Sequence, residues 1–217
     1  MKMKSLILLM ALIGLFINGC GDKDSDDKQT THKEEKPKPL NNFVMVLNDD
    51  SQIIINQKIP DAPKDNFKNI EPKDEQESIL KDFIITSPAL ESEIKILYFF
   101  TTWCEPCIGI LPHLDNLQKQ FGDKIKFIGI PLDDILEKTE NFPQTLHIFV
   151  EENAITFPMV EGNERQTLCR ALGEVEGIPL MALYDNNGNY LIHYLGAIPE
   201  EMLEFDLSYN LTKLRAK

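Results

Sequence analysis

The stretch Phe99-Phe100-Thr101-Thr102-Trp103-Cys104-Glu105-Pro106-Cys107 decides the fold of this chain. It continues an apolar run that starts at Ile94 and carries one lysine, Lys95, which is typical of a buried central strand. From position 105 onward apolar residues recur at helical spacing up to Phe121, and Gly122 follows as a helix terminator. The two cysteines therefore stand where a buried strand leads into an amphipathic helix.

A Cys-x-x-Cys pair at the start of a helix is suited to thiol chemistry. Cys104 is expected beside the free N–H groups and the positive dipole end of the helix, which stabilise a thiolate. Cys107 follows one turn later, so its sulfur can resolve a mixed disulfide. Pro106 falls in the first turn, where a missing N–H costs nothing, whereas the charge of Glu105 is expected to oppose part of the thiolate stabilisation. The pattern predicts thiol-disulfide exchange, with Cys104 attacking and Cys107 resolving.

The remaining residues of the C-terminal half alternate between strand and helix patterns. The expected strands are 124–132, 157–160 and a hairpin of 180–184 with 190–195, and the expected helices are 144–153, 163–172 and 199–214. This order predicts an α/β fold with a central mixed sheet flanked by helices. Ahead of it, 43–47 and 53–55 predict an extra N-terminal β-hairpin. The segment 60–78 is polar and irregular, and 79–86 fits either a strand or a helical turn.

Residues 1–19 predict a signal peptide. Lys2 and Lys4 precede an apolar run from Leu6 to Ile17 that is too short for a comfortable membrane span. The run ends at Ile17-Asn18-Gly19-Cys20, which resembles the lipoprotein box of bacteria. That resemblance implies cleavage before Cys20 and attachment of acyl chains such as palmitate to it. A plain cleaved signal and an uncleaved anchor are the alternatives, and each of the three exports the domain.

Three further expectations follow from composition. Residues 20–42 hold the predicted lipidated cysteine and a polar, flexible tether with a reach of about 25 Å, and 43–217 form the folded domain. The net charge of −13 repels phosphate backbones, so nucleic acid is not an expected partner. An exported protein can hold disulfides. With Cys20 assigned to lipid, three of the four cysteines remain, and at least one stays unpaired within the monomer.

Residues 94–214 resemble the thioredoxin superfamily, and within it the membrane-tethered TlpA/ResA-like thiol:disulfide oxidoreductases. The resemblance is carried by the stretch from Phe99 to Cys107, by Gly177-Ile178-Pro179 and by Tyr184-Asp185-Asn186-Asn187-Gly188. It implies a thioredoxin-like fold in which a cis-proline, Pro179, faces the cysteine pair. Five residues would then line the substrate groove: Trp103, Glu105, Pro106, Ile178 and Pro179.

The chain departs from that family at three positions. Thioredoxin carries a buried aspartate where this chain has Tyr98, and some tethered reductases carry a glutamate where it has Ile110. Leu180 follows the expected cis-proline, where threonine is frequent. Both usual carboxylates for proton transfer to the buried cysteine are therefore missing. Lys95 and Glu105 are the nearest ionisable residues in sequence, and neither has an assigned role.

The resemblance favours a reductase of disulfides in proteins of the bacterial envelope, with an apocytochrome c among the candidate clients. In an oxidising compartment such a reductase needs a membrane electron donor. No metal and no cofactor is expected beyond the redox-active Cys104–Cys107 disulfide. The motif alone leaves the direction of electron flow open, because oxidants and reductants share it.

Other interpretations of the cysteines remain open. Thr101-x-x-Cys104 also fits a thiol peroxidase, although the expected upstream proline is absent. A metal- or haem-handling module could use the cysteine pair, although the histidines are scattered. Cys169, in a helical pattern, is expected to be a small buried hydrophobe, with a third redox thiol as the alternative. His113 is expected to be solvated or packed rather than a proton donor.

Overall fold

The computed structural model describes most of the chain from Asn42 onward. The described residues are 42–58, 75–88, 90–137, 139, 141–172, 175 and 177–216. The predicted signal peptide, Cys20 and all but the last residue of the predicted tether lie outside this part, as does most of the polar segment 60–78. Within the described residues, no helix has the length and apolar composition needed to cross a lipid bilayer.

An antiparallel sheet of three strands comes first along the chain. Its strands, in spatial order, are β1 (Phe43–Val46), β2 (Gln52–Gln57) and β3 (Phe83–Thr86). In β2 the buried Ile53 and Ile55 alternate with more exposed residues, which is the pattern of a strand covered on one face. The predicted N-terminal hairpin is confirmed, and a third strand extends it. The segment 79–86 contains both expected structures, since the end of helix α1 (Glu75–Lys81) precedes β3.

The central sheet has four strands in the order β5-β4-β6-β7. Their bounds are β4 (Ile94–Phe100), β5 (Ile125–Pro131), β6 (Leu180–Asp185) and β7 (Tyr190–Leu195). β4 runs parallel to β5 and antiparallel to β6, and β6 and β7 form a hairpin that turns at Gly188, where φ is +84°. All seven residues of β4 are buried. The predicted mixed sheet with a buried central strand is confirmed.

One predicted strand, 157–160, does not form a ladder. Only two isolated bridges occur there, between Met159 and Gly129 and between Val160 and Leu47. Pro158 has no N–H to donate, which prevents continuous pairing with β5. Gly129 allows the close approach, because a Cβ at that position would lie 2.9 Å from the Cγ of Met159. The segment therefore links the edge of β5 to the N-terminal sheet without extending either sheet.

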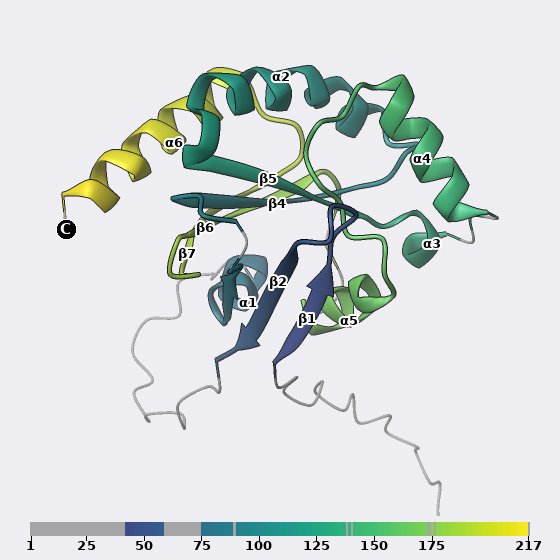
Figure 1. Ribbon diagram of the computed structural model, residues 1–217, viewed down its shortest axis with the longest axis horizontal. Coiled ribbons are helices and arrows are strands. Elements are labelled where there is room, and N and C mark those ends of the chain that lie inside the picture. Colours follow the sequence, from purple (N-terminus) through teal and green to yellow (C-terminus); the bar gives the residue numbers. More distant parts are fainter. Residues whose placement is uncertain are drawn as a thin grey trace, which may run out of the picture. The chain divides into compact units, whose positions relative to one another are not determined.

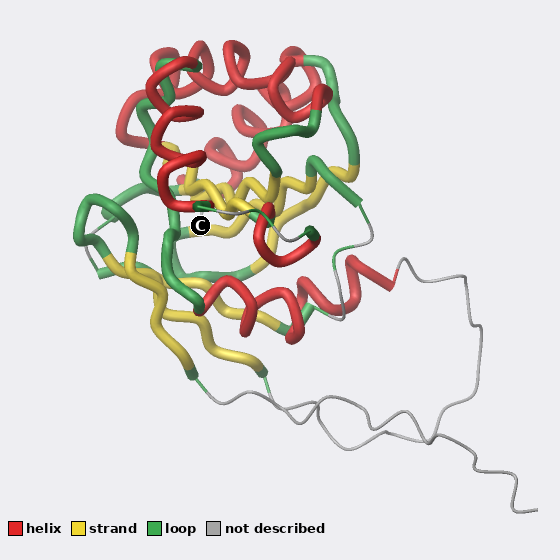
Figure 2. The backbone as a smooth tube through the Cα atoms, turned by 90° about the vertical axis from the view of Figure 1, so that its right-hand side faces the viewer, coloured by secondary structure: helices red, strands yellow, loops and turns green. Residues whose placement is uncertain are grey.

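Helices cover both faces of the central sheet. Their bounds are α2 (Glu105–Phe121), α3 (Asp133–Leu136), α4 (Phe142–Glu152), α5 (Glu164–Ala171) and α6 (Glu200–Arg215), and a short 3-10 helix spans Gly122–Lys124. Figures 1 and 2 show α2, α4 and α6 on one side of the sheet, with α1, α5 and the N-terminal sheet on the other side. The helices predicted at 105–121, 144–153, 163–172 and 199–214 are confirmed to within two residues at each end.

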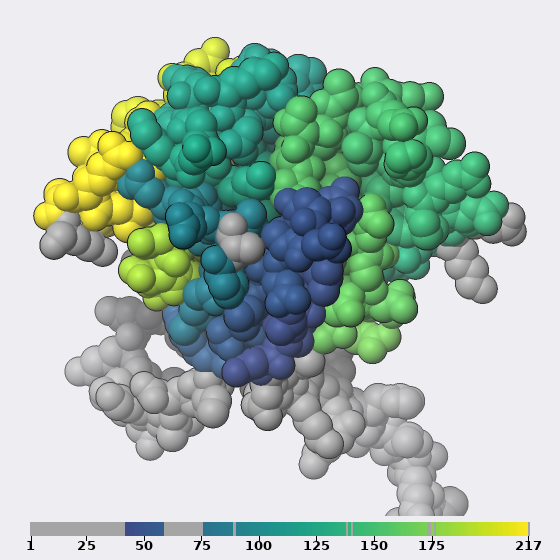
Figure 3. Space-filling model, in the orientation of Figure 1, coloured from purple at the N-terminus to yellow at the C-terminus, as the bar shows by residue number. Residues whose placement is uncertain are grey.

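Two hydrophobic cores lie on opposite faces of β4, because successive side chains of a strand point to opposite sides. The α2-side core contains Tyr98, Phe100, Cys104 and Cys107, together with leucines of α2 and α6. The α5-side core consists of the N-terminal strands, Leu97, Phe99, Leu168, Cys169 and Tyr184, with neighbours from α1. Figure 3 shows the blue surface of the N-terminal strands adjoining a green surface, and α5 contacts β1 directly.

Candidate active site

The loop between β4 and α2 carries the cysteine pair. α2 begins at Glu105, so Cys104 caps its N-terminus with an extended backbone, φ −82° and ψ 101°. The Cys104 Sγ accepts a hydrogen bond from the Cys107 N–H at 3.2 Å. Pro106 lies in the first turn, where it removes no helical hydrogen bond. A sulfur that receives a helix N–H is stabilised as a thiolate once the disulfide is opened.

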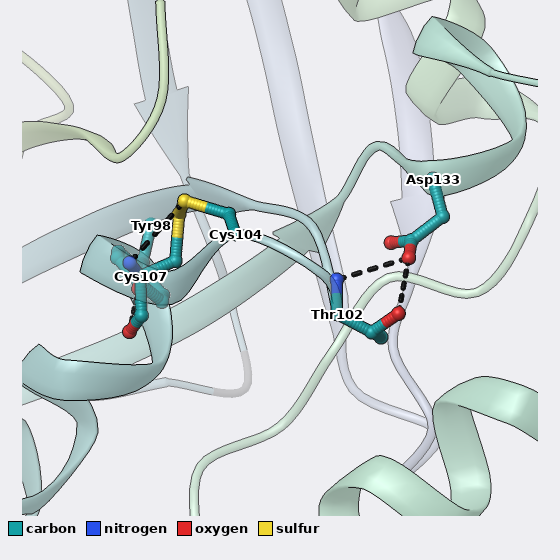
Figure 4. The surroundings of a disulfide bond; sticks show 5 residues. All are labelled: Tyr98, Thr102, Cys104, Cys107 and Asp133. Carbon is teal, nitrogen blue, oxygen red and sulfur yellow. Dashed lines mark hydrogen bonds between the residues drawn. A yellow bond between two sulfur atoms is a disulfide. The ribbon is translucent and has the colours of Figure 1, made fainter.

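Cys104 and Cys107 form a disulfide, with Cα atoms 5.2 Å apart (Figure 4). Cys104 keeps 6% of its surface exposed, whereas Cys107 is fully buried. Of the two cysteines, only Cys104 therefore keeps any surface that a partner molecule can contact. This arrangement is the one that the exchange hypothesis requires, and the separate roles of the two cysteines stay a prediction.

Three of the five residues expected in a substrate groove belong to this loop and to the first turn of α2. Trp103 is 48% exposed, and Glu105 and Pro106 are exposed as well. The Ile178–Pro179 peptide bond is cis, as the family resemblance implies. Ile178 is partly buried and packs against both cores, of which the α2-side core contains the two cysteines. The exposed indole of Trp103, the residue before Cys104, gives an approaching chain an apolar surface to contact.

Tyr98 occupies the position where an aspartate is expected in thioredoxin. Its side chain is fully buried, and its hydroxyl donates a hydrogen bond of 2.8 Å to the carbonyl oxygen of Cys107. The ring stacks on Phe100, with centroids 5.2 Å apart. Burial raises the pKa of Tyr98 well above its usual range. The phenol is therefore a neutral donor that holds the backbone of Cys107.

Asp133 is the site residue that the sequence patterns do not reveal. It is the first residue of α3, separated from the end of β5 by Leu132 alone, and none of its surface is exposed. Its Oδ1 accepts two hydrogen bonds from Thr102, at 2.9 Å from the N–H and at 2.5 Å from the hydroxyl (Figure 4). The signal available in the sequence is its place after a buried parallel strand, where functional residues of α/β sheets gather.

Other candidates lie away from the disulfide or pair elsewhere. Ile110 is buried in α2, as an apolar residue in the place of a carboxylate. His113 is half-exposed, and its Nδ1 lies 2.6 Å from a carboxylate oxygen of Glu200. Lys95 lies near the start of β4, at the opposite end of the strand from the cysteines. Burial lowers the pKa of Lys95, and the nearby Asp185 partly opposes that shift.

Cys169 is a free thiol in the α5-side core, with 6% of its surface exposed. Burial raises its pKa to about 11, although Arg165 opposes part of this shift. It lies on the face of the central sheet opposite to Cys104 and Cys107. Across the described residues, His, Cys, Asp and Glu side chains form no cluster of three or more that could hold a metal ion.

Comparisons with known proteins agree with this geometry. Residues 92–190 match the family model described as thioredoxin-like. Over 167 residues the chain is 26% identical to thiol-disulfide oxidoreductase ResA of Oceanobacillus iheyensis, covering 75% of this chain and 77% of that protein. It is 31% identical to the thioredoxin-like protein YneN of Bacillus subtilis over 65 residues, covering 30% of this chain and 36% of YneN. The matches to thioredoxin 2 of two Plasmodium species likewise span about a third of those proteins, 29% and 32%.

A solved structure shows the same fold. The thiol:disulfide interchange protein of Chlorobium tepidum matches with a TM-score of 0.50 and 20% identity, covering 80% of this chain and 95% of that chain. At this identity the match shows a shared fold over most of the chain. Residues 92–190 thus form a thioredoxin-like domain, and the chain around it is similar to ResA.

Proposed function

We propose that this protein is a thiol-disulfide oxidoreductase in which Cys104 attacks and Cys107 resolves. The observation that carries the proposal is the position of the Cys104 Sγ. It lies at the N-terminus of α2 and accepts the N–H of Cys107, and Cys104 is the less buried residue of the pair. The similarity to a protein named thiol-disulfide oxidoreductase supports the same reaction.

The reaction needs only the two thiols of the reduced protein and a disulfide in the client. The Cys104 thiolate attacks one client sulfur, forms a mixed disulfide and releases the other client sulfur, which takes up a proton. The Cys107 thiolate then attacks the Cys104 Sγ, restores the Cys104–Cys107 bond and releases the second client sulfur. Two electrons and two protons pass from the protein to the client. The disulfide is the redox centre, and no further cofactor enters this balance.

We infer that the protein works as a reductase in the bacterial cell envelope. The signal-like residues 1–19 and the lipoprotein-like Cys20 support export and lipid anchoring, and the polar residues 21–42 would let the domain reach partners away from the membrane. The clients are then envelope proteins that carry a disulfide, an apocytochrome c among them. A membrane electron donor restores the Cys104–Cys107 dithiol after each turnover.

A trapping experiment tests the exchange reaction. In Cys107→Ser the resolving thiol is lost, so Cys104 is expected to remain joined to an oxidised protein client as a mixed disulfide that dithiothreitol releases. The double variant Cys104→Ser/Cys107→Ser is the matched control and is expected to trap nothing. If Cys107→Ser forms no mixed disulfide with insulin or with envelope extracts, and the wild-type protein does not accelerate insulin reduction, the proposed function is wrong.

The midpoint potential tests the direction of electron flow. A reductase is expected at about −250 mV or below when the protein is equilibrated with glutathione or dithiothreitol, near thioredoxin on the same scale. A value above about −150 mV, in the range of strong oxidants, would reverse the proposed direction while leaving the exchange reaction in place.

A further inference from the structure

Asp133 is a carboxylate that receives no contact with water in this fold. It is fully buried, and the charged form of a carboxyl group is costly to bury unless its oxygens receive hydrogen bonds. Only its Oδ1 receives them, from the N–H and the hydroxyl of Thr102. Its Oδ2 is buried and has no hydrogen-bond partner among the described residues. An unpaired buried acceptor destabilises a fold by about 1–3 kcal/mol, so stability alone does not account for this residue.

The partner of Asp133 belongs to the reactive loop. Thr102 lies two residues before Cys104, and Trp103 stands between them. The Thr102 N–H is in neither β4 nor α2, so no strand or helix supplies it with an acceptor. Figure 4 shows Asp133 lying across Thr102 from the disulfide, so that the loop runs between the carboxylate and the two sulfurs.

A second contact ties the same segments together. The Leu132 N–H donates to the carbonyl oxygen of Phe100 at 2.8 Å, one residue before Asp133 and two residues before Thr102. The end of β5 thus holds the end of β4, and Asp133 extends this attachment past the strand into the loop. Two successive anchors leave Trp103 and Cys104 little freedom to move before α2 begins.

We propose that Asp133 is a positioning residue of the exchange reaction, which holds Thr102 and through it the Cys104 sulfur in the geometry for attack. The proposal rests on the proposed function of the cysteine pair. Attack on a disulfide requires the incoming sulfur to be aligned with the bond that breaks, and small misplacements of a reacting group reduce rates strongly. Relatives carry a carboxylate at the positions that Tyr98 and Ile110 occupy in this chain. Here the buried carboxylate near the reactive loop is Asp133, which follows the neighbouring strand β5.

The neighbouring residue of α3 supplies a matched control. Asp134 binds the guanidinium of Arg165 with distances of 2.8 Å and 3.1 Å and has no hydrogen bond to the reactive loop among the described contacts. Removing the Asp134 carboxylate breaks a well-formed ion pair in the same short helix. Asp134→Ala therefore loosens α3 without touching Thr102, whereas Asp133→Ala removes the contact with Thr102.

The test measures how fast Cys104 of the full, reduced protein reacts with the small aromatic disulfide 5,5′-dithiobis(2-nitrobenzoic acid). All variants carry Cys20→Ser and Cys169→Ser, so that only the site cysteines react. Asp133→Ala is expected to slow the reaction about tenfold, and Asp133→Asn, whose amide can still bond Thr102, to recover most of that loss. Thr102→Ser, which keeps both donors, is expected to stay within twofold of the parent. Asp134→Ala is expected to lower the unfolding temperature and to leave the rate within twofold.

A double variant separates positioning from general loosening. If the two residues act through their contact, Asp133→Ala/Thr102→Val reacts no more slowly than Asp133→Ala alone. Equal rates for Asp133→Ala and Asp134→Ala, or full additivity of the double variant, would overturn the proposal. If Asp133→Ala does not fold, Asp133→Asn and Thr102→Val carry the same comparison. Failure of the wild-type protein with every protein client would instead refute the proposed function, because the reaction with the small disulfide is measured separately.

Discussion

The two faces of the central sheet hold cysteines that are equally buried and chemically different. Cys104 and Cys169 each expose 6% of their surface. Each face also carries a buried tyrosine whose hydroxyl donates to a backbone carbonyl, Tyr98 to Cys107 and Tyr184 to Leu80. The faces differ in where the cysteine stands on its helix. Cys104 caps the N-terminus of α2, whereas Cys169 lies inside α5.

That difference in helix position accounts for the difference in chemistry. The Cys104 sulfur receives an N–H that the helix does not use, and Cys107 stands next to it. The N–H groups around Cys169 are used within α5, and burial without a hydrogen-bond donor raises its pKa to about 11. Arg165 would favour a thiolate at Cys169, but its guanidinium binds Asp134 and the carbonyl of Pro131. Exposure alone therefore does not decide which cysteine reacts.

Serine substitutions should separate the two faces most strongly. Cys104→Ser is expected to reduce the acceleration of insulin reduction by at least about a thousandfold, because a serine hydroxyl cannot form the mixed disulfide. Cys169→Ser, at an equally buried position, is expected to stay within about twofold. Turnover of insulin with dithiothreitol measures both. A large loss of insulin reduction in Cys169→Ser, with unchanged unfolding behaviour, would show that Cys169 is a third redox thiol. The two faces would then not differ in chemistry.

Alkylation of the reduced protein should show the next largest difference. A thiol with a pKa of about 11 is thiolate in about one molecule in a thousand at pH 8. Cysteines of Cys-x-x-Cys sites are mostly thiolate at that pH. Iodoacetamide is therefore expected to label Cys104 about a thousandfold faster than Cys169, with the Cys169 rate rising tenfold per pH unit. Mass spectrometry of the two peptides measures the ratio, and comparable rates at pH 8 would contradict the role of helix position.

The sequence predicts the central sheet and α2 better than the segments that join the edges of the sheet. The run into Cys104, the helix that follows and the hairpin at Gly188 carry strong local patterns, and each forms as expected. The strand expected at 157–160 fails because Pro158 cannot pair, a constraint visible in the sequence. The third strand of the N-terminal sheet follows a helix in an ambiguous segment, so periodicity could not separate the two.

The residues of the site also differ in how well the sequence predicts them. Cys104, Cys107 and Trp103 are adjacent in sequence, and the family resemblance adds Ile178 and Pro179. Asp133 reaches Thr102 from 31 residues away through the parallel pairing of β4 and β5. Such a contact depends on the register of two strands, and one aspartate after a strand has no distinctive pattern. A single sequence therefore does not predict the long-range contact of one polar residue such as Asp133.

Unfolding at alkaline pH should show how the buried thiol of Cys169 affects the stability of the protein. The folded Cys169 thiol has a pKa of about 11, against 9.0 for an ordinary thiol. Between these values the unfolded chain releases this proton while the folded protein keeps it, so stability falls as pH rises. In the oxidised protein Cys104 and Cys107 do not titrate. Among the described residues, Cys169 is therefore the one thiol whose ionisation contributes to this loss of stability.

The expected loss is about 1 kcal/mol per pH unit between pH 9 and 11 and is steepest near pH 10. Urea unfolding of the oxidised protein at pH 8, 9 and 10 measures it. Cys169→Ala is expected to be less stable at pH 8 and to lose about 1 kcal/mol less between pH 9 and 10. An unchanged pH slope in Cys169→Ala would mean that this thiol is not held protonated by the fold.

The two tyrosines provide the finest test, because their phenylalanine variants lose the same kind of bond on opposite faces. Tyr98→Phe removes a hydrogen bond to Cys107 and Tyr184→Phe removes one to Leu80, both between buried groups. Each is expected to lower the free energy of unfolding by about 1 kcal/mol, since one buried carbonyl loses a donor. Only Tyr98→Phe is expected to change the resolving step, slowing release of a mixed disulfide by about threefold, because only Tyr98 holds the backbone of a site cysteine.

Urea unfolding measures the loss of stability in the two variants, and stopped-flow decay of the mixed disulfide measures the resolving step. Equal effects of both variants on that decay would mean that the site senses general stability rather than the hydroxyl of Tyr98.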